Sequence, residues 1–367
     1  MHHTSAFEER AKKVMRPVSN SIKGLLRVKL LFGLLWLTTI AAPAVYAQGE
    51  SAWQPQRTWV FVVGTLEWQD RETFESFPKE NRRDRELVRF FRDAGVPDAQ
   101  IVYLQDRAAT TRRIQSELRA LLSKTREGDT LFLYYTGHGY KNESGRAYFA
   151  SYDANEEDNP GWAVDAIPAT IERYFKGARA FLTADCCYSG ALADAVRSQR
   201  RSQISYAVFT SATSDKLSTG NWTFTETLLA GLRGRAYVDT DGNGEVTFNE
   251  LGREIKGDMT FAEEQTASYL LTGEYEPQTV LADAQARADQ RVGARVEVWS
   301  EGDWYKARII DAGRGRYRVH YYGYEDEYDE WVRPSQIRGN SERRGRRSPA
   351  SPLGRATGND FSGASQF

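Results

Sequence analysis

Apolar runs typical of buried strands alternate with amphipathic helical patterns along most of the chain. Strands are expected at Trp59–Thr65 (WVFVVGT), Ile101–Leu104, Thr130–Tyr135, Ala180–Ala184, Tyr206–Thr210 and Thr279–Ala282. Helices are expected at Asp84–Asp93, Thr111–Lys124, Ile167–Phe175 and Thr223–Leu232. Strands that consist of continuous apolar runs are usually buried on both faces. The alternation therefore predicts an α/β domain in which helices flank a mostly parallel sheet.

Two of these strands end in chemically reactive motifs. LFLYYTGHGY ends with His138 between two glycines, and AFLTADCCYSG ends with Cys186 and Cys187. Ligands of open parallel sheets bind beyond the carboxyl ends of the strands, so both motifs are delivered to one edge. A cysteine is a good nucleophile near neutral pH, and an imidazole can transfer its proton. We therefore predict a catalytic cysteine–histidine pair rather than a buried structural cysteine and an unrelated loop histidine.

The sequence TGHG followed by DCCYSG resembles the caspase-like cysteine peptidases, and metacaspases more than animal caspases. Supporting stretches are LQDRAAT (104–110), ASYDA (150–154), TSAT (210–213) and TFTETLLAGLRG (223–234). The likeness covers residues 56–285. It implies a caspase-haemoglobinase-type fold, protein or peptide substrates, and peptide-bond hydrolysis through an acyl-enzyme.

The same resemblance implies roles for individual residues. Similar enzymes have the pattern Asp-x-Cys-x-Ser-Gly, which places the nucleophile at Cys187. Adjacent residues at a strand end point to opposite faces, so Cys186 is expected to pack in the core. By resemblance, His138 is the general acid and base, and the backbone N–H groups of Gly139 and Cys187 form an oxyanion hole.

A carboxylate beside the nucleophile bears on substrate choice. Asp185 lies two residues before Cys187, so its side chain is expected on the same face, where it suits a cationic Arg or Lys at the cleaved residue. Similarity to metacaspases adds Asp84, Ser211 and Thr136 to this pocket. Two alternatives stay open: Asp185 is a structural hydrogen-bond acceptor, or the enzyme prefers Asp or Asn.

An acidic segment, DTDGNGEVTFNE at 239–250, fits the twelve-residue EF-hand loop. The expected ligands are the side chains of Asp239, Asp241, Asn243, Thr247 and Glu250 and the carbonyl of Glu245. Oxygen atoms at these offsets surround a hard cation, so the loop predicts bound Ca²⁺, with an exiting helix near Leu251–Ile255. The alternative is a surface turn that only resembles the motif. No organic cofactor is expected.

Residues 291–338 have short alternating strands dense in Trp, Tyr and Gly, which is typical of a small β-barrel. VHYYGY and DEWV resemble the chromo-barrel and Tudor-knot group, whose aromatic cage binds methylated lysine. The matching positions are Tyr305, Tyr321, Tyr324 and Tyr328, and aromatic faces attract such cations. The alternative is that these rings form a core and a peptide-binding face. The sequence does not identify the ligand of this module. Nucleic-acid binding is not favoured, because the module mixes Asp and Glu with its Arg residues.

The N-terminus predicts export. A basic segment precedes the apolar run Leu30–Ala44, and small residues follow at Ala47, as in a cleaved secretory signal peptide (1–47). The protein is therefore expected to be secreted or periplasmic, with no stable membrane span after cleavage; the alternative is an uncleaved anchor. Residues 1–47 carry about five net positive charges, so the mature chain is mildly acidic. Residues 339–367 are predicted to be a disordered tail.

Together these patterns predict an exported caspase-like cysteine endopeptidase that cleaves after Arg or Lys and carries a calcium loop and a C-terminal barrel. Only two cysteines are present, which excludes a disulfide scaffold. The main alternative is a catalytically silent caspase-fold adaptor or scaffold with a peptide-binding barrel.

Overall fold

The computed structural model describes residues 53–155, 157–199, 202–286 and 289–339, all within the compact unit Gln48–Phe367. The predicted signal peptide lies outside the described residues, and so does the predicted tail except for Gly339. Within the described ranges, no helix combines the length and apolar character that a membrane crossing requires.

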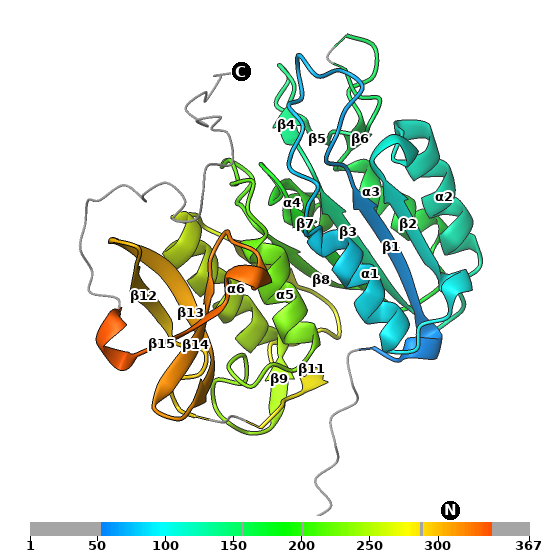
Figure 1. Cartoon of the computed structure of the whole chain (residues 1–367). Helices are drawn as coiled ribbons and strands as arrows, with labels where there is room; N and C mark the ends of the chain where they lie inside the picture. Colours follow the sequence, from blue (N-terminus) through cyan, green and yellow to red (C-terminus); the bar gives the residue numbers. More distant parts are fainter. Residues whose placement is uncertain (1–52, 156, 200–201, 287–288, 340–367) are drawn as a thin grey trace, which may run out of the picture. The chain divides into compact units, whose positions relative to one another are not determined.

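A six-stranded sheet forms the centre of residues 53–286 (Figure 1). Its strands are β1 (Thr58–Gly64), β2 (Ile101–Gln105), β3 (Thr130–Thr136), β7 (Arg179–Asp185), β8 (Ser205–Thr210) and β10 (Ser268–Leu271). Their order is β10-β8-β7-β3-β1-β2, and every neighbouring pair is parallel except β10 with β8. The predicted mostly parallel sheet is therefore confirmed.

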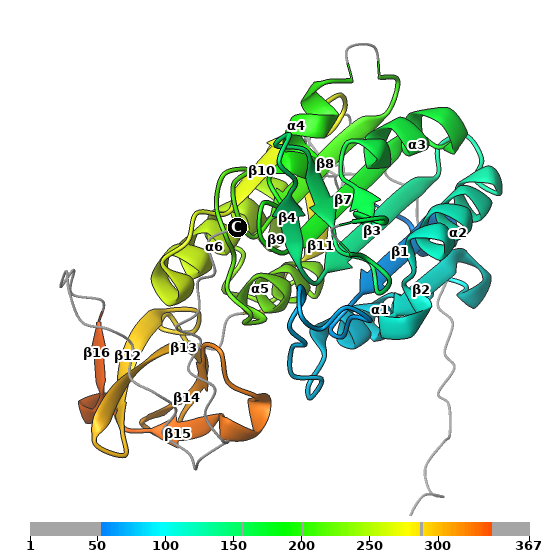
Figure 2. The same ribbon diagram turned by 90° about the horizontal axis from the view of Figure 1, so that it is seen from above.

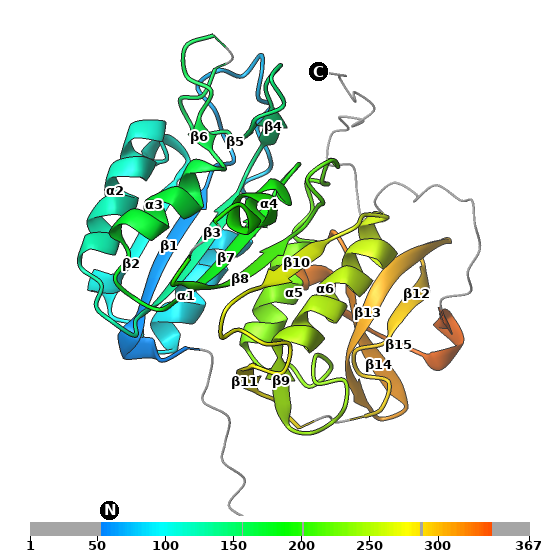
Figure 3. The ribbon, with the colours of Figure 1, turned by 180° about the vertical axis from the view of Figure 1, so that it is seen from behind.

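Helices cover both faces of this sheet, as Figures 2 and 3 show. One layer contains α1 (Arg83–Asp93), α5 (Thr223–Leu232) and α6 (Phe248–Glu263); the other contains α2 (Thr111–Ser123), α3 (Ala166–Tyr174) and α4 (Ala191–Arg197). Successive strand residues point to opposite faces. Accordingly, Val60 and Val62 of β1 pack with the α1 layer, whereas Phe61 and Val63 pack with the α2 layer.

Two small sheets lie beside the main one. One contains β4 (Gly139–Lys141), β5 (Ala147–Phe149) and β6 (Trp162–Ala163). The other pairs β9 (Glu245–Thr247) with β11 (Val280–Asp283). The sequence predicts a strand at Thr279–Ala282, but this strand pairs with β9, and β10 forms the edge of the main sheet instead. Short 3-10 turns occupy Pro55–Arg57, Asp98–Gln100, Asp106–Ala108, Asp326–Tyr328 and Pro334–Gln336.

Residues 291–339, called the C-terminal module below, form a five-stranded antiparallel sheet. Its strands are β12 (Arg295–Ser300), β13 (Asp303–Gly313), β14 (Arg316–Tyr321), β15 (Glu330–Val332) and β16 (Ile337–Gly339). The order β15-β14-β13-β12-β16 leaves β15 and β16 at opposite edges, with no pairing between them in the described residues. The module has its own core, around Val298, Ala307 and Val319. The small all-β module is present, but closure into a barrel is not confirmed.

Candidate active site

His138 and Cys187 follow neighbouring parallel strands at matching positions. Thr136, the last residue of β3, pairs in register with Asp185, the last residue of β7. His138 and Cys187 each lie two residues beyond this pair. The strand register therefore brings both motifs to the same edge of the sheet.

The two motifs also touch through Gly139. A side chain at residue 139 would overlap the backbone carbonyl of Cys187 and come within 3.0 Å of the Cys186 sulfur. Glycine therefore allows the backbone after His138 to lie directly against the cysteine motif.

The His138 ring is held by a backbone carbonyl and an aromatic shell. Its Nε2 lies 2.7 Å from the carbonyl oxygen of Glu75. Because a carbonyl only accepts, Nε2 carries the proton in this bond, and Nδ1 is left as the acceptor in the neutral ring. Trp68 and Phe77 lie 4.5 Å from the ring centre, and Phe74 lies 5.8 Å from it. This burial lowers the pKa of His138, so the ring is neutral at pH 7.

The Cys187 sulfur accepts a hydrogen bond from the Ser218 backbone N–H at 3.1 Å and lies 3.6 Å from the Ser218 carbonyl. Burial raises the pKa of this thiol, so it is protonated at rest. Among the described residues, Cys187 and His138 do not hydrogen-bond to each other. The arrangement therefore contains a neutral thiol and a neutral imidazole at one sheet edge, and the thiol must lose its proton as it reacts.

Cys186 points the other way. It is 3% exposed and packs in the core on the α2 side of the sheet. Burial raises the pKa of its thiol, which keeps it protonated and unreactive. Both cysteines are free thiols.

Asp185 lies buried beneath the edge. Its carboxylate accepts a hydrogen bond of 2.6 Å from the Thr225 hydroxyl on α5. Burial is the main cause that raises the pKa of Asp185 to about 7, although hydrogen bonds from Thr225 and Ser211 act in the opposite direction. The group is therefore close to half-ionised at neutral pH, and a nearby cation would favour its charged form.

A pocket of about 420 Å³ opens over Asp185, and Thr136 and Gly137 also line it. Four carboxylates contribute to its lining, from Glu80, Asp185, Glu226 and Glu325, against one cation, Arg83. Arg83 is already paired with Glu86, Glu226 and Asp326. The pocket is therefore suited to a cationic ligand.

Two residues that the sequence assigns to this pocket occupy other places. Asp84 is fully buried, where it pairs with Arg82 at 2.8 Å and accepts from the Tyr103 hydroxyl at 2.8 Å. The Ser211 hydroxyl accepts from the backbone N–H of Cys186 at 3.1 Å. Neither residue lines the pocket. Asp84 and Ser211 therefore hold neighbouring groups in place.

The predicted calcium loop brings three carboxylates together. Oxygen atoms of Asp239, Asp241 and Glu250 lie within 4.8 Å of one another. Helix α6 begins at Phe248, within the last three residues of the loop, and a capping box joins Thr247 to Glu250. In the loop itself, Asn243 accepts a hydrogen bond from the Glu245 N–H. A cluster of hard oxygen donors of this kind fits Ca²⁺.

The four predicted cage tyrosines form one cluster. Neighbouring rings among Tyr305, Tyr321, Tyr324 and Tyr328 meet edge to face, with centres 6.0–6.3 Å apart. Tyr305 and Tyr321 are only 7% and 6% exposed and belong to the core of the module, whereas Tyr324 and Tyr328 are half-buried. Core packing thus accounts for two of the rings, and Tyr324 also lines the pocket above Asp185.

Sequence reasoning missed the surroundings of His138. The Glu75 carbonyl is a backbone group, and no side-chain pattern identifies it. The aromatic shell did leave a signal, because Trp68, Phe74 and Phe77 are large apolar residues in an otherwise charged loop. Such residues in a loop often cover a site.

Comparison with known proteins agrees with the peptidase interpretation. Residues 97–196 match the family described as metacaspase, peptidase C14 domain, a segment that contains His138, Gly139 and Cys187. The match supports a caspase-like cysteine peptidase. No curated protein matches the chain.

Several solved structures are similar. Protein GSU0716 from Geobacter sulfurreducens is 13% identical, with a TM-score of 0.44, over 62% of this chain and 100% of that chain. Caspase-1 from Spodoptera frugiperda is 14% identical, with a TM-score of 0.38, over 64% and 93%. The Drosophila initiator caspase Dronc is 11% identical, with a TM-score of 0.36, over 59% and 79%.

Proposed function

We propose that the protein is a cysteine endopeptidase that cleaves after Arg or Lys, with Cys187 as nucleophile and His138 as general acid and base. The observation that carries the proposal is the register of β3 and β7, which pairs Thr136 with Asp185 and starts both reactive motifs from the same edge.

In the first half of the reaction, the Cys187 sulfur attacks the scissile carbonyl carbon while its proton passes to Nδ1 of His138. Nε2 stays bonded to the Glu75 carbonyl, which orients the ring and favours the resulting imidazolium. The carbonyl oxygen becomes an anion, and we assign the backbone N–H groups of Gly139 and Cys187 to bind it. When the C–N bond breaks, His138 returns the proton to the leaving amine, and a thioester remains on Cys187.

In the second half, His138 removes a proton from a water molecule that attacks the thioester. The tetrahedral intermediate then expels the Cys187 sulfur, which recovers the proton, and the acid product leaves. Because the pKa of His138 is lowered by burial, the ring is ready to accept a proton in both halves.

Specificity for a basic residue follows from the pocket above Asp185. Glu226 and Arg83 are paired with each other, which leaves three carboxylates of the lining without an ion pair to any described residue: Glu80, Asp185 and Glu325. A guanidinium or ammonium group at the cleaved residue would keep Asp185 ionised and donate charge-assisted hydrogen bonds to its carboxylate.

A fluorogenic peptide panel tests the proposal. Peptides that differ only in Arg, Lys, Asp or Asn at the cleaved residue are incubated with residues 48–367, and cleavage rates are compared. We expect Arg and Lys peptides to be cleaved at least about 100-fold faster than Asp peptides, because an acidic side chain is repelled and desolvated in this pocket. Preference for Asp or Asn would refute the specificity, and no cleavage of any peptide would favour the adaptor alternative.

We also propose that the loop 239–250 binds Ca²⁺. The carboxylates of Asp239, Asp241 and Glu250 would supply negative oxygen ligands, with Asn243, Thr247 and the Glu245 carbonyl completing the set. Bound calcium would stabilise the connection from α5 to α6, because the loop lies between these two helices.

Calorimetric unfolding with saturating calcium and with a chelator tests this site. A ligand at about 100 times its Kd adds about 2.7 kcal/mol, so the Tm should rise by roughly 5 °C with calcium. Asp241→Ala removes a ligand but leaves the capping box between Thr247 and Glu250 intact, and it should abolish the rise. Glu245→Gln is the control, since only its carbonyl is expected to bind. An equal Tm with and without calcium would contradict the proposal.

A further inference from the structure

The pocket above Asp185 is built from two parts of the chain that are far apart in sequence. Thr136, Gly137 and Asp185 line it from the main sheet, and Gly323, Tyr324 and Glu325 line it from the C-terminal module. The last three residues follow β14 and precede the 3-10 turn Asp326–Tyr328. One loop of the module therefore forms part of the pocket wall.

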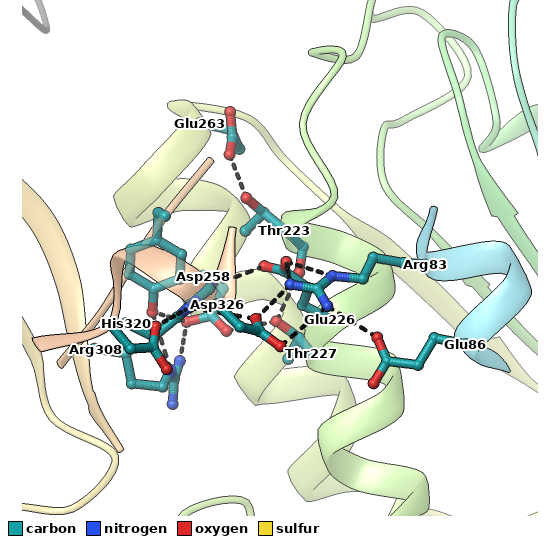
Figure 4. Close-up of polar contacts among 12 residues, drawn as sticks. Arg83, Glu86, Thr223, Glu226, Thr227, Asp258, Glu263, Arg308, His320 and Asp326 are labelled. Atoms are coloured by element: carbon teal, nitrogen blue, oxygen red, sulfur yellow. Dashed lines mark hydrogen bonds and ion pairs between the residues drawn. The ribbon is translucent and has the colours of Figure 1, made fainter. Parts of the chain in front are cut away.

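Ion pairs on both sides of this loop fix its position (Figure 4). Asp326, the residue directly after Glu325, pairs with Arg83 of α1 at 2.6 Å. His320 of β14 lies 3.4 Å from Glu226 of α5 and 2.8 Å from Asp329 of the module. Burial alone would lower the pKa of His320, but the hydrogen bonds to Asp329 and Glu226 raise it to about 10, so the ring is cationic at neutral pH. The loop is thus held to α1 and α5 by charge.

A second, deeper contact holds the module itself. Arg308 of β13 is buried, and its guanidinium pairs with both Glu254 and Asp258 of α6. Arg295 of β12 also pairs with Asp258, at 2.7 Å. Breaking a buried ion pair leaves an uncompensated charge, which makes separation of the module from α6 unfavourable. The module is therefore a fixed part of the pocket.

Glu325 is the carboxylate that the C-terminal module adds to the pocket lining; Glu80, from the loop before α1, also lines the pocket without an ion pair to any described residue. The Glu325 side chain is half-buried and has neither an ion pair nor a hydrogen bond with any residue the structure describes. Arg83, the cation on the same pocket wall, is already held by Glu86, Glu226 and Asp326. A carboxylate that lines a pocket without a cationic partner would attract a cationic ligand group.

We infer that the C-terminal module completes the substrate pocket and that Glu325 is a specificity-determining residue, a second anionic group for the Arg or Lys side chain bound over Asp185. This inference rests on the proposed peptidase function. It gives the module a direct role in substrate selection, separate from any ligand of its tyrosine cluster.

Kinetics of full-length mature variants test the inference. Glu325→Gln should lower kcat/KM for Arg and Lys peptides by about fivefold, mainly through KM, and Glu325→Lys should lower it by roughly 100-fold because it introduces repulsion. Cleavage of a peptide with an uncharged residue at the same position should change by less than about twofold, or rise with Glu325→Lys. Glu327→Gln is the matched control, because Glu327 is exposed, lies two residues away and does not line the pocket.

The outcomes separate this inference from the proposed function. If the wild type cleaves after Arg but Glu325→Gln and Glu325→Lys match it on every peptide, the inference is wrong and the peptidase function stands. Equal losses on charged and uncharged peptides would also overturn it, because they indicate a general structural effect. If the wild type fails to cleave Arg and Lys peptides, both proposals fail.

Discussion

Cys187→Ala is expected to reduce peptide cleavage by at least about 1,000-fold, to the background rate, whereas Cys186→Ala keeps most of the activity. The two sulfurs are adjacent in sequence but differ in place: Cys187 lies at the sheet edge beside Ser218, and Cys186 lies in the core. Without the Cys187 sulfur no thioester can form. Steady-state assays with an Arg peptide on both variants measure the difference.

Covalent labelling provides an independent check on this result. A peptidyl-arginine fluoromethyl ketone alkylates only a thiol that a bound substrate can reach, and mass spectrometry locates the adduct. We expect the adduct on Cys187 in the wild type and in Cys186→Ala, and none in Cys187→Ala. Activity retained by Cys187→Ala, or an adduct on Cys186, would disprove the assigned nucleophile. Melting curves of both variants are compared with the wild type, so that a loss of activity is not confused with unfolding. We expect the curves to match, because each Cys→Ala change removes only one sulfur atom.

The strands with continuous apolar runs could be predicted from sequence because burial on both faces leaves a strong signal. The runs that became β1, β3, β7 and β8 are of this kind. Strand β10 was not predicted. Its four residues are all half-buried, and it pairs with the sheet on one side only, so it lacks a long apolar run. Short edge strands depend on tertiary pairing more than on local sequence.

The location of the candidate site was predictable, but its surroundings were not. The end of each apolar strand marks where its motif emerges, which is enough to bring His138 and Cys187 to one edge. The partner of Asp84 was not predictable, because the sequence does not say which acid Arg82 will pair with when α1 folds. The contact between His138 and the Glu75 carbonyl could not be predicted either, because every residue has a backbone carbonyl and the sequence does not show which one will be the partner.

The contribution of the C-terminal module to the pocket could not be predicted from the sequence either. Its aromatic and alternating pattern predicts a separate small β domain, and nothing in that pattern says where the domain docks. Docking depends on charge pairs such as Arg308 with Asp258, whose partners lie 50 positions apart. Charged residues are usually solvated, so a sequence gives no sign that these particular ones are buried together.

Asp185→Asn is expected to lower kcat/KM for Arg peptides by roughly 100-fold, since it removes the negative charge at the base of the pocket but keeps the shape of the side chain. The amide can still accept the hydrogen bond from Thr225 that Asp185 accepts at 2.6 Å, so the fold should be retained. Cleavage of a peptide with an uncharged residue should change little. If the variant cleaves Arg peptides as fast as the wild type, Asp185 is only a structural acceptor.

The pH dependence distinguishes a binding carboxylate from a structural one. Burial raises the pKa of Asp185 to about 7, so in the free protein the group is neutral below that pH and charged above it. Only the charged form attracts a cation, so kcat/KM for Arg peptides should rise as the pH increases through about 7. The charge of Asp185 also contributes to the raised pKa of Cys187, so the ratio of wild type to Asp185→Asn for an Arg peptide is divided by the same ratio for an uncharged peptide, which removes this effect. We expect the resulting quotient to increase by roughly tenfold between about pH 5.5 and about pH 8. If the Arg peptide and the uncharged peptide show the same dependence on pH, the charge of Asp185 does not contribute to recognition.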